Sequence, residues 1–254
     1  MMKGNVILVV HCAFLLHILD QVSRASGACD CARNTARLYT GLSEVDPNKH
    51  SWMVQIIVKS FGKDPIKCSG VIINPNQVMA PWNCIKQGRV KIIAHVGDRL
   101  HKKSKEIFNV YEARDVNKEY SPGVGILAIG GNIFSSVKPI CIARISELAS
   151  ATKIFFVWSD QGDLYRFIPE GESLSDEPSS SSKANVRYTA DGSHVVTEGY
   201  DQWVRKSVFV YLKDGRWFLE GIANYYSTTN RAEYFARVDG IYYDKACETQ
   251  DLEN

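Results

Sequence analysis

The chain has 254 residues, of which 45% are hydrophobic and 23% charged, with a formal net charge of +2. This hydrophobic share supplies a sizeable core and excludes a disordered protein. The near-neutral charge argues against a nucleic-acid partner or a membrane-surface partner. The length suits one large all-β domain or two ordinary domains.

Residues 1–28 have the pattern of a secretory signal peptide. Lys3 precedes an apolar run at residues 6–19, and small residues follow as far as Ala28. A basic start, an apolar run and a small-residue site predict cleavage before Cys29. A membrane anchor is the alternative, but the run is shorter than the ~20 residues that span a bilayer. We therefore expect a secreted, extracellular and soluble mature protein.

Six of the seven cysteines remain after the leader and its Cys12 are removed: Cys29, Cys31, Cys68, Cys84, Cys141 and Cys247. An even number in a secreted chain predicts three disulfides. Zinc is the competing interpretation, but Cys29-Asp30-Cys31 lacks the spacing of a zinc knuckle and no Cys/His cluster completes four ligands. No metal and no cofactor are expected.

Short runs rich in Val, Ile and aromatic residues follow a polar arm at residues 29–37. They lie at residues 52–58, 70–75, 90–96, 107–113, 207–212 and 216–226. Such runs, separated by turn residues, are typical of β-strands. Lys213-Asp214-Gly215 between the last two runs predicts a hairpin. Many strands without alternating helices predict an all-β sandwich or barrel.

The segment at residues 170–193 differs from the rest because it is polar and contains four consecutive serines. This composition predicts a mobile surface loop. A phosphorylation or O-glycosylation tract is the alternative, but an ordinary solvated loop fits the composition better.

Seven segments, in chain order, resemble the trypsin/chymotrypsin-like serine protease family. They are HSWMVQI, CSGVIINPNQVMAPWNC, GILAI, VKPICI, FFVWS, KDGRWFLEGIANYY and YFARVDGIYYDKAC. The resemblance covers nearly the whole mature chain and sets the domain at residues 38–254, after a propeptide-like arm at 29–37. It implies two packed six-stranded antiparallel β-barrels, a short C-terminal helix and a cleft between the barrels.

The resemblance also implies that the catalytic triad is degenerate. The histidine position is Asn83, the aspartate position is Gly125 and the serine position, counted without gaps, is Arg205. An amide cannot act as a general base near neutral pH, and a triad needs all three groups. A two-residue gap would instead place Ser207 at the nucleophile position, without the flanking glycines.

Other functional positions of the family are replaced as well. The oxyanion-hole glycine becomes Trp203, and the acid that receives the freed amine becomes Val204. The floor of the substrate pocket becomes Gly199, and its edge reads Asn224-Tyr225-Tyr226, so that the two tyrosines would block the pocket mouth. The candidate cleavage site is Arg37–Leu38, but cutting there would find no acid to receive the new amine.

The resemblance further suggests the disulfide pairing. Cys68 is expected to pair with Cys84, and Cys141 with either Cys29 or Cys31. Whichever of these two is left would pair with Cys247.

The mature histidines offer no substitute site in the sequence. They are His50, His95, His101 and His194, and none has a nearby serine or cysteine flanked by glycines. We interpret them as surface or packing residues. The basic loop at residues 101–105 is a candidate interaction surface, although such runs are usually solvated.

These observations predict that the protein is not an enzyme. We expect a secreted, monomeric serine protease homologue that binds an extracellular protease, protease inhibitor or host defence protein as a decoy, cofactor or inhibitor. The short Cys-Asp-Cys arm resembles that of secreted arthropod proteases of venom, saliva or haemolymph. The alternatives are residual or rebuilt serine hydrolase activity, and small-molecule or glycan binding in the old cleft.

Overall fold

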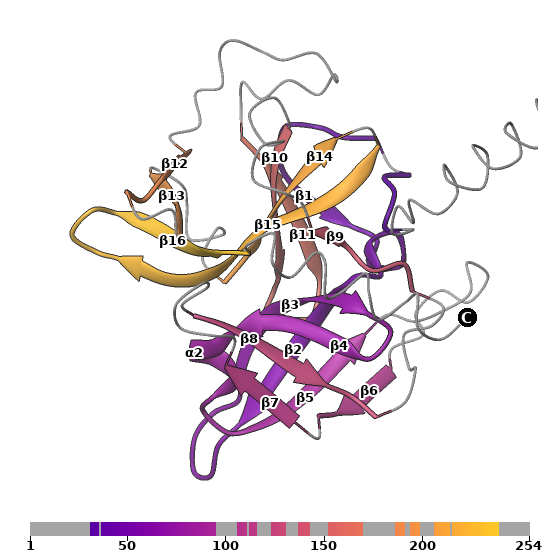
Figure 1. Cartoon of the computed structure of the whole chain (residues 1–254), viewed down its shortest axis with the longest axis vertical. Helices are drawn as coiled ribbons and strands as arrows, with labels where there is room; N and C mark the ends of the chain where they lie inside the picture. The colour runs from indigo at the N-terminus through magenta and orange to yellow at the C-terminus, as the bar shows by residue number, and fades with distance from the viewer. Residues whose placement is uncertain are drawn as a thin grey trace, which may run out of the picture. The chain divides into compact units, whose positions relative to one another are not determined.

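Two twisted β-sheets hold most of the regular structure in the computed structural model (Figure 1). The structure describes residues 31–35, 37–94, 106–110, 112–115, 123–130, 137–142, 152–169, 186–190, 194–198, 206–213 and 215–238. All of them lie in one unit, Cys31–Asn254. Within these ranges the only helical elements are a 3-10 turn, η1 (Pro47–His50), and one α-helical turn, α2 (Trp82–Ile85). The predicted all-β fold class is confirmed.

The first sheet has seven strands in the order β6-β5-β2-β3-β4-β8-β7, and every neighbouring pair is antiparallel. Its strands are β2 (Met53–Lys59), β3 (Ile66–Asn74), β4 (Gln77–Pro81), β5 (Arg89–Ala94), β6 (Glu106–Asn109), β7 (Glu112–Asp115) and β8 (Val124–Ala128). Val and Ile are frequent in β2, β3 and β5, and these β-branched residues pack well on a pleated surface.

The second sheet has nine strands in the order β1-β11-β10-β14-β15-β16-β13-β12, with β9 pairing in parallel with β15. Its strands are β1 (Gly41–Val45), β9 (Cys141–Ile142), β10 (Thr152–Trp158), β11 (Leu164–Ile168), β12 (Val186–Tyr188), β13 (His194–Glu198), β14 (Val208–Lys213), β15 (Arg216–Ser227) and β16 (Ala232–Arg237). The sequence predicts six strands in each barrel, and short strands such as β9 and β12 raise the number in this sheet.

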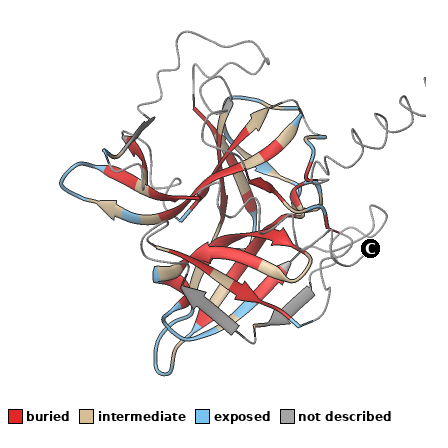
Figure 2. Ribbon diagram, viewed as in Figure 1, coloured by how far each residue is buried: buried red, intermediate tan, exposed pale blue. Residues whose placement is uncertain are grey.

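One hydrophobic cluster joins the two sheets. The first sheet contributes Met53, Val71 and Met79, and the second contributes Phe156 and Trp217, all of them buried (Figure 2). The rings of Phe156 and Trp217 meet edge to face with their centroids 5.4 Å apart. Because this cluster removes apolar surface of both sheets from water, it holds one sheet against the other.

The hairpin predicted at Lys213-Asp214-Gly215 is present. Lys213 pairs with Arg216 across the turn, and Gly215 has a φ of 69°. A positive φ favours glycine, which explains why Asp-Gly marks this connection in the sequence.

Two predicted segments differ from the structure. The run at residues 107–113 is not one strand but two, because β6 pairs with β5 while β7 pairs with β8. These strands lie at opposite ends of the sheet order, and because only two residues separate them, the curled sheet brings its two edges together here. Within the loop predicted at residues 170–193, Val186–Tyr188 forms β12 against β13, since β-branched and aromatic residues favour strands. Residues 170–185 and 191–193 lie outside the described residues.

Two of the expected disulfides are present. Cys68–Cys84 links β3 to α2, and Cys31–Cys141 links the arm to β9. The sequence leaves two candidates for Cys141, and the structure selects Cys31. Of the six cysteines that follow the predicted leader, Cys29 and Cys247 lie outside the described residues.

The predicted C-terminal helix would follow Val238, beyond the described part of the chain. No described helix has the length and apolar character needed to cross a membrane.

Candidate functional site

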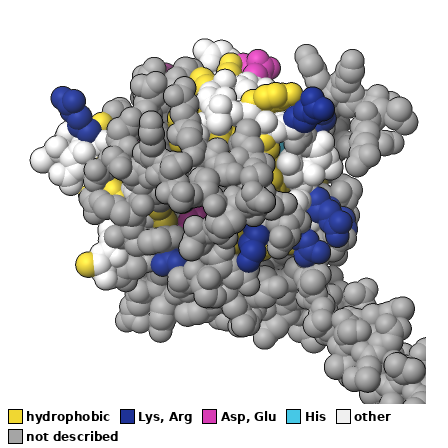
Figure 3. Space-filling view, turned by 90° about the horizontal axis from the view of Figure 1, so that it is seen from above, with side chains coloured by type: hydrophobic (Ala, Val, Ile, Leu, Met, Phe, Trp, Pro, Cys, Tyr) yellow, Lys and Arg dark blue, Asp and Glu magenta, His cyan; other side chains and the backbone are white. Residues whose placement is uncertain are grey.

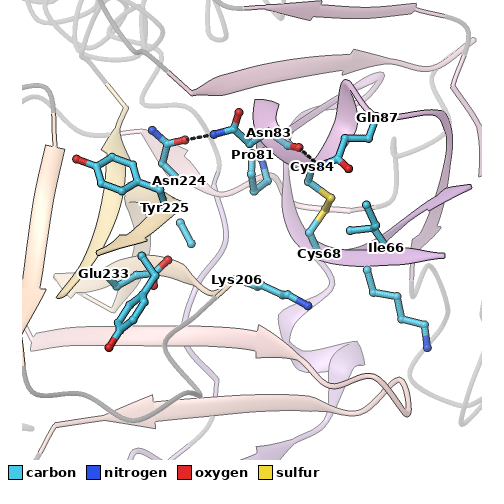
Figure 4. Close-up of a pocket in the computed structure, with 13 residues that line it drawn as sticks. Ile66, Cys68, Pro81, Asn83, Cys84, Gln87, Lys206, Asn224, Tyr225 and Glu233 are labelled. Atoms are coloured by element: carbon cyan, nitrogen blue, oxygen red, sulfur yellow. Dashed lines mark hydrogen bonds between the residues drawn. A yellow bond between two sulfur atoms is a disulfide. The ribbon is translucent and has the colours of Figure 1, made fainter. Parts of the chain in front are cut away.

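A cavity of about 260 Å³ lies between the two sheets. Asn83 and Cys84 of α2 line one side, and Asn224 and Tyr225 of β15 line the other (Figure 4). We call it the inter-sheet cavity. It brings together six of the residues that the sequence singles out, namely Asn83, the pocket-edge residues Asn224, Tyr225 and Tyr226, and the disulfide pair Cys68 and Cys84.

Asn83 is presented to this cavity by the single helical turn α2. The disulfide of Cys84, the next residue, anchors the turn to β3. The backbone N–H of Trp82 donates to the carbonyl of Gly123 at 2.8 Å, which ties the turn to the start of β8. The side-chain amide of Gln87 donates to the Asn83 carbonyl. These contacts fix the backbone of an otherwise exposed residue.

The Asn83 side chain takes part in a hydrogen-bond chain that crosses the cavity. Its Nδ2 donates to Asn224 Oδ1 at 3.0 Å, as the facing side chains in Figure 4 show. The Nδ2 of Asn224 lies 3.1 Å from His194 Nε2. Because an amide nitrogen can only donate, His194 Nε2 accepts here, so the neutral ring carries its proton on Nδ1. We call this the Asn83–Asn224–His194 chain.

The side chain of Asn224 fills the space beside Gly123. A Cβ at Gly123 would lie 2.4 Å from atoms of the Asn224 side chain, which is closer than non-bonded heavy atoms approach a Cβ in folded proteins. Gly125, the predicted aspartate position, lies two residues further on and pairs with Ala80 in the β4–β8 ladder. Neither glycine supplies a carboxylate, and the group that hydrogen-bonds Asn83 is an amide.

Aromatic rings form the β15–β16 wall of the site. Tyr225 stacks on Tyr234 with the ring centroids 4.4 Å apart and the planes 11° apart, and the His194 ring meets Tyr225 edge-on at 5.7 Å. Tyr225 is 46% exposed and Tyr226 is half-buried, and both line the cavity.

Lys206 and Ser207 lie where the sequence does not decide which residue takes the serine position of the resembled family, Arg205 or Ser207. Lys206 is exposed, lines the cavity and has a φ of 65°, a left-handed conformation that is uncommon for a residue with a side chain (Figure 4). Ser207 is 0% exposed, and its carbonyl accepts from the N–H of Ala223 at 3.1 Å. The serine that a gapped alignment would make the nucleophile is therefore buried away from solvent.

Several predicted site residues fall outside the described part of the chain: Gly199, Trp203 and Arg205. Within the described part, no group of three or more His, Cys, Asp or Glu residues is placed to hold a metal ion.

Sequence reasoning missed the role of two residues at this site. Asn224 is noted in the sequence only as part of the pocket edge, and His194 only as a surface or packing histidine. Their contact depends on the pairing of β13 with β16 and of β16 with β15, which carries no local signal.

The two sheets curl into half-barrels with the inter-sheet cavity between them, which is a trypsin-like fold. The trypsin family model matches residues 39–160, so this part of the chain is similar to that family. A solved structure described as "Structure of GrC" aligns with a TM-score of 0.55 at 13% sequence identity, covering 85% of this chain and 100% of that chain. At that identity the likeness concerns the fold alone. No curated protein sequence matches the chain.

Proposed function

We propose that the protein is a secreted, non-catalytic trypsin-like homologue that acts by binding another extracellular protein. The hydrogen bond between the side chains of Asn83 and Asn224 carries the proposal. In the resembled family the position of Asn83 holds the histidine that takes the proton from the serine. A primary amide is not basic near neutral pH, so Asn83 cannot do this.

Among the described residues, the side-chain partner of Asn83 is the amide of Asn224 and not a carboxylate that could orient a base. The amide of Asn224 also occupies the space beside Gly123, two residues before Gly125. A histidine placed at position 83 would therefore face an amide in place of an aspartate. Loss of triad members typically lowers turnover by factors of about 10⁴ to 10⁶.

A rebuilt hydrolase site is the competing function, and among the described histidines His194 is the one that contacts a cavity residue, Asn224. Its Nε2 is engaged by the amide of Asn224. General-base catalysis would need a hydroxyl or thiol at ~3 Å from that nitrogen. Ser207, the serine that an alternative alignment favours, is fully buried.

The exposed surface of the site favours protein binding over other ligands. Tyr225 is 46% exposed on a stacked tyrosine pair, and aromatic side chains are common binding hot spots. The cavity of about 260 Å³ is smaller than the ~300–1,000 Å³ of usual small-molecule sites, although an aromatic wall would also suit a sugar ring. On the face seen in Figure 3, the described Lys and Arg side chains lie in several separate places and form no single basic patch.

The partner and the setting rest on the family resemblance. An extracellular protease, a protease inhibitor or a host defence protein is the expected class, and an arthropod venom or salivary protein is the expected setting. The two disulfides of the described part are typical of proteins that fold in an oxidising compartment.

Active-site labelling tests the absence of catalysis. The oxidised protein is titrated with a fluorophosphonate probe before and after trypsin cleavage, with an active trypsin-like protease as the positive control. We expect no labelling of either form. Stoichiometric labelling that disappears in Ser207→Ala would show a live serine and would contradict the proposal.

A matched pair of tyrosine variants tests the binding role. Tyr225→Ala removes the exposed ring at the cavity, whereas Tyr39→Ala removes a 59% exposed ring that does not line it. The wild-type protein and both variants are compared for capture of the same partner band from extracellular fluid. We expect only Tyr225→Ala to lose the band, and equal capture by all three would exclude the cavity wall as the binding surface.

Expression of the full chain in eukaryotic cells tests secretion. We expect the protein in the medium with Cys29 as its first residue, and retention in the cells with an intact N-terminus would contradict the signal-peptide interpretation.

A further inference from the structure

A buried arginine lies beside the candidate cleavage site. Arg166 of β11 is 2% exposed. Its Nη1 donates to the backbone carbonyl of Arg37 at 3.3 Å, and its Nη2 donates to the hydroxyl of Ser43 at 3.4 Å. Its Nε has no hydrogen-bond partner. Among the described residues, no carboxylate lies within ion-pair distance of this guanidinium.

Within the described residues this buried charge has no carboxylate partner, and only the neighbouring Tyr39 acts to raise the pKa of Arg166. Moving an ion from water into a protein interior is strongly unfavourable unless an opposite charge and hydrogen bonds replace the lost water. Two long hydrogen bonds to neutral oxygens replace little of it. Burial accordingly lowers the pKa of Arg166, and its positive charge helps to lower the pKa of His50.

The bond after Arg37 lies at the surface, between the exposed Arg37 and Leu38, which is half-buried against the cluster that joins the two sheets. Arg37 is exposed, and Tyr39, two residues later, is 59% exposed. Residues 37–40 belong to no strand, and β1 begins only at Gly41. Exposed segments without regular structure are the preferred sites of proteolytic cleavage.

The arm before this bond is held in place independently of it. The Cys31–Cys141 disulfide ties the arm to β9. The N–H of Ala32 donates to the Pro139 carbonyl at 2.8 Å, and the N–H of Trp217 donates to the Ala32 carbonyl at 2.9 Å. Arg37 lies six residues after Cys31, so cutting behind it leaves its carbonyl group close to Arg166.

We propose that Arg166 is a receptor for the carboxylate that cleavage of the Arg37–Leu38 bond creates, so that the new C-terminus at Arg37 stays bound beside β11 while the Cys31–Cys141 disulfide holds the rest of the arm. An external trypsin-like protease supplies the catalysis and water is the co-reactant. The C–N bond breaks, the water oxygen joins the Arg37 carbonyl carbon to give a carboxylate, and the amide nitrogen leaves as the amine of Leu38, which is protonated. The neutral acceptor of the Arg166 hydrogen bond thereby becomes an anion.

The chemistry favours this pairing. A guanidinium and a carboxylate form two parallel hydrogen bonds of ~2.7–2.9 Å, shorter and stronger than a bond to a neutral carbonyl. The present contact of 3.3 Å needs to tighten by only a few tenths of an ångström. The resembled family buries the freed amine after cleavage, whereas this inference concerns the opposite end of the cut.

Thermal unfolding of intact and cut protein tests the proposal. Limited trypsin treatment is stopped when mass spectrometry shows a single cut after Arg37, and the Tm of each form is measured for wild type and Arg166→Gln. The change in Tm caused by cutting is compared between the two proteins. We expect it to be about 2–4 °C more positive in wild type than in Arg166→Gln, because only wild type gains an ion pair. Arg37→Gln keeps the carbonyl, resists trypsin at this bond and serves as the matched control. Equal Tm changes in wild type and Arg166→Gln would mean that Arg166 only supports the fold and would overturn the proposal.

Trimming of the cut protein provides a second measurement. A carboxypeptidase specific for C-terminal arginine removes Arg37 only when its carboxylate is free. We expect trimming to be about tenfold slower in wild type than in Arg166→Gln, with Arg166→Lys, which keeps the charge but not the planar fork, between them. If Arg166→Gln does not fold, the comparison with Arg166→Lys decides. Equal trimming rates would overturn the proposal.

Discussion

At the scale of single residues, the Asn83–Asn224 hydrogen bond joins α2 to β15 across the inter-sheet cavity. We predict that Asn83→Ala lowers the free energy of unfolding by about 0.5–1.5 kcal/mol, because it removes one hydrogen bond and leaves the amide of Asn224 with one partner fewer. Urea unfolding measures the change. Lys86→Ala, an exposed substitution at the end of the same helical turn, is the control and should change stability by less than about 0.5 kcal/mol. Equal losses in both variants would show that the bond contributes nothing.

His50 is a second residue that affects a measurable property, the pH dependence of stability. It is 1% exposed among the rings of Trp52, Phe156 and Trp217, and neither ring nitrogen has a hydrogen-bond partner. Burial, and after it the charge of Arg166, lowers the pKa of His50 to about 3. The predicted packing role of this histidine agrees with that position.

The sign of the pH dependence follows from that pKa. Between pH 6.5 and about pH 3 the unfolded chain binds a proton at His50 and the folded chain does not. The contribution of neutral His50 to the free energy of unfolding is therefore fully present above pH 6.5. It falls as the pH is lowered towards about 3, by up to about 1.4 kcal/mol per pH unit. We predict that His50→Phe removes this part of the slope in urea unfolding between pH 6.5 and 4. An unchanged slope in the variant would assign the acid sensitivity to other groups.

The sequence predicts some residues of the site but not the contacts between them. Asn83 is predictable because it stands in a dense local pattern between Cys68 and Cys84. Its partner Asn224 is 141 residues away, and only the packing of the two sheets brings the two amides together. Asn224 and His194 could be placed at the site only once the strand order was known.

At the scale of elements, the start of β8 is shaped around the Asn224 side chain. Gly123 has a φ of 96°, and a Cβ there would lie 2.4 Å from Asn224. We predict that Gly123→Ala costs about 1–3 kcal/mol in the free energy of unfolding, since it adds both backbone strain and a steric clash. Gly130→Ala, at a glycine with open space and no positive φ, is the control.

A double variant separates the two causes. Asn224→Ala removes the clash but not the positive φ, so Gly123→Ala should cost less in that background than in wild type. The difference between the two costs measures the steric part. If the cost is the same in both backgrounds, strain alone accounts for it and the filled space beside Gly123 has no energetic role.

The elements themselves follow from the sequence where the signal is local. Residues 52–58 and 216–226 are β-branched and aromatic runs and become β2 and β15, and the Asp-Gly turn between β14 and β15 is specified by two residues. The division of residues 107–113 into β6 and β7 has no such signal. The division arises because the curled sheet brings its first and last strands together. That curling depends on all the strands between β6 and β7.

At the scale of the whole molecule, the order of seven quoted segments suffices to predict two β-barrels, but not which strands meet at their junction. That junction is set by the shared cluster around Trp217 and Met53, whose members come from both halves of the chain. The prediction of a degenerate triad rests on positions that interrupt otherwise regular sequence patterns. The role proposed for Arg166 cannot be predicted from the sequence, because an arginine in a strand gives no indication of its burial or of its partner.

The two described disulfides constrain the molecule to different extents. Cys31–Cys141 closes a separation of 110 residues, whereas Cys68–Cys84 closes 16. A cross-link stabilises mainly by limiting the unfolded chain, and in that model a loop of ~15 residues gives about 3 kcal/mol and one of ~100 residues about 4.7 kcal/mol. We predict that the paired change Cys31→Ala with Cys141→Ala lowers stability more than Cys68→Ala with Cys84→Ala, as measured by urea unfolding without reductant. The first pair also removes the covalent link between the arm and β9. If the Cys68–Cys84 pair costs more, the anchoring of α2 in the folded state outweighs chain entropy, and the backbone around Asn83 is strained without it.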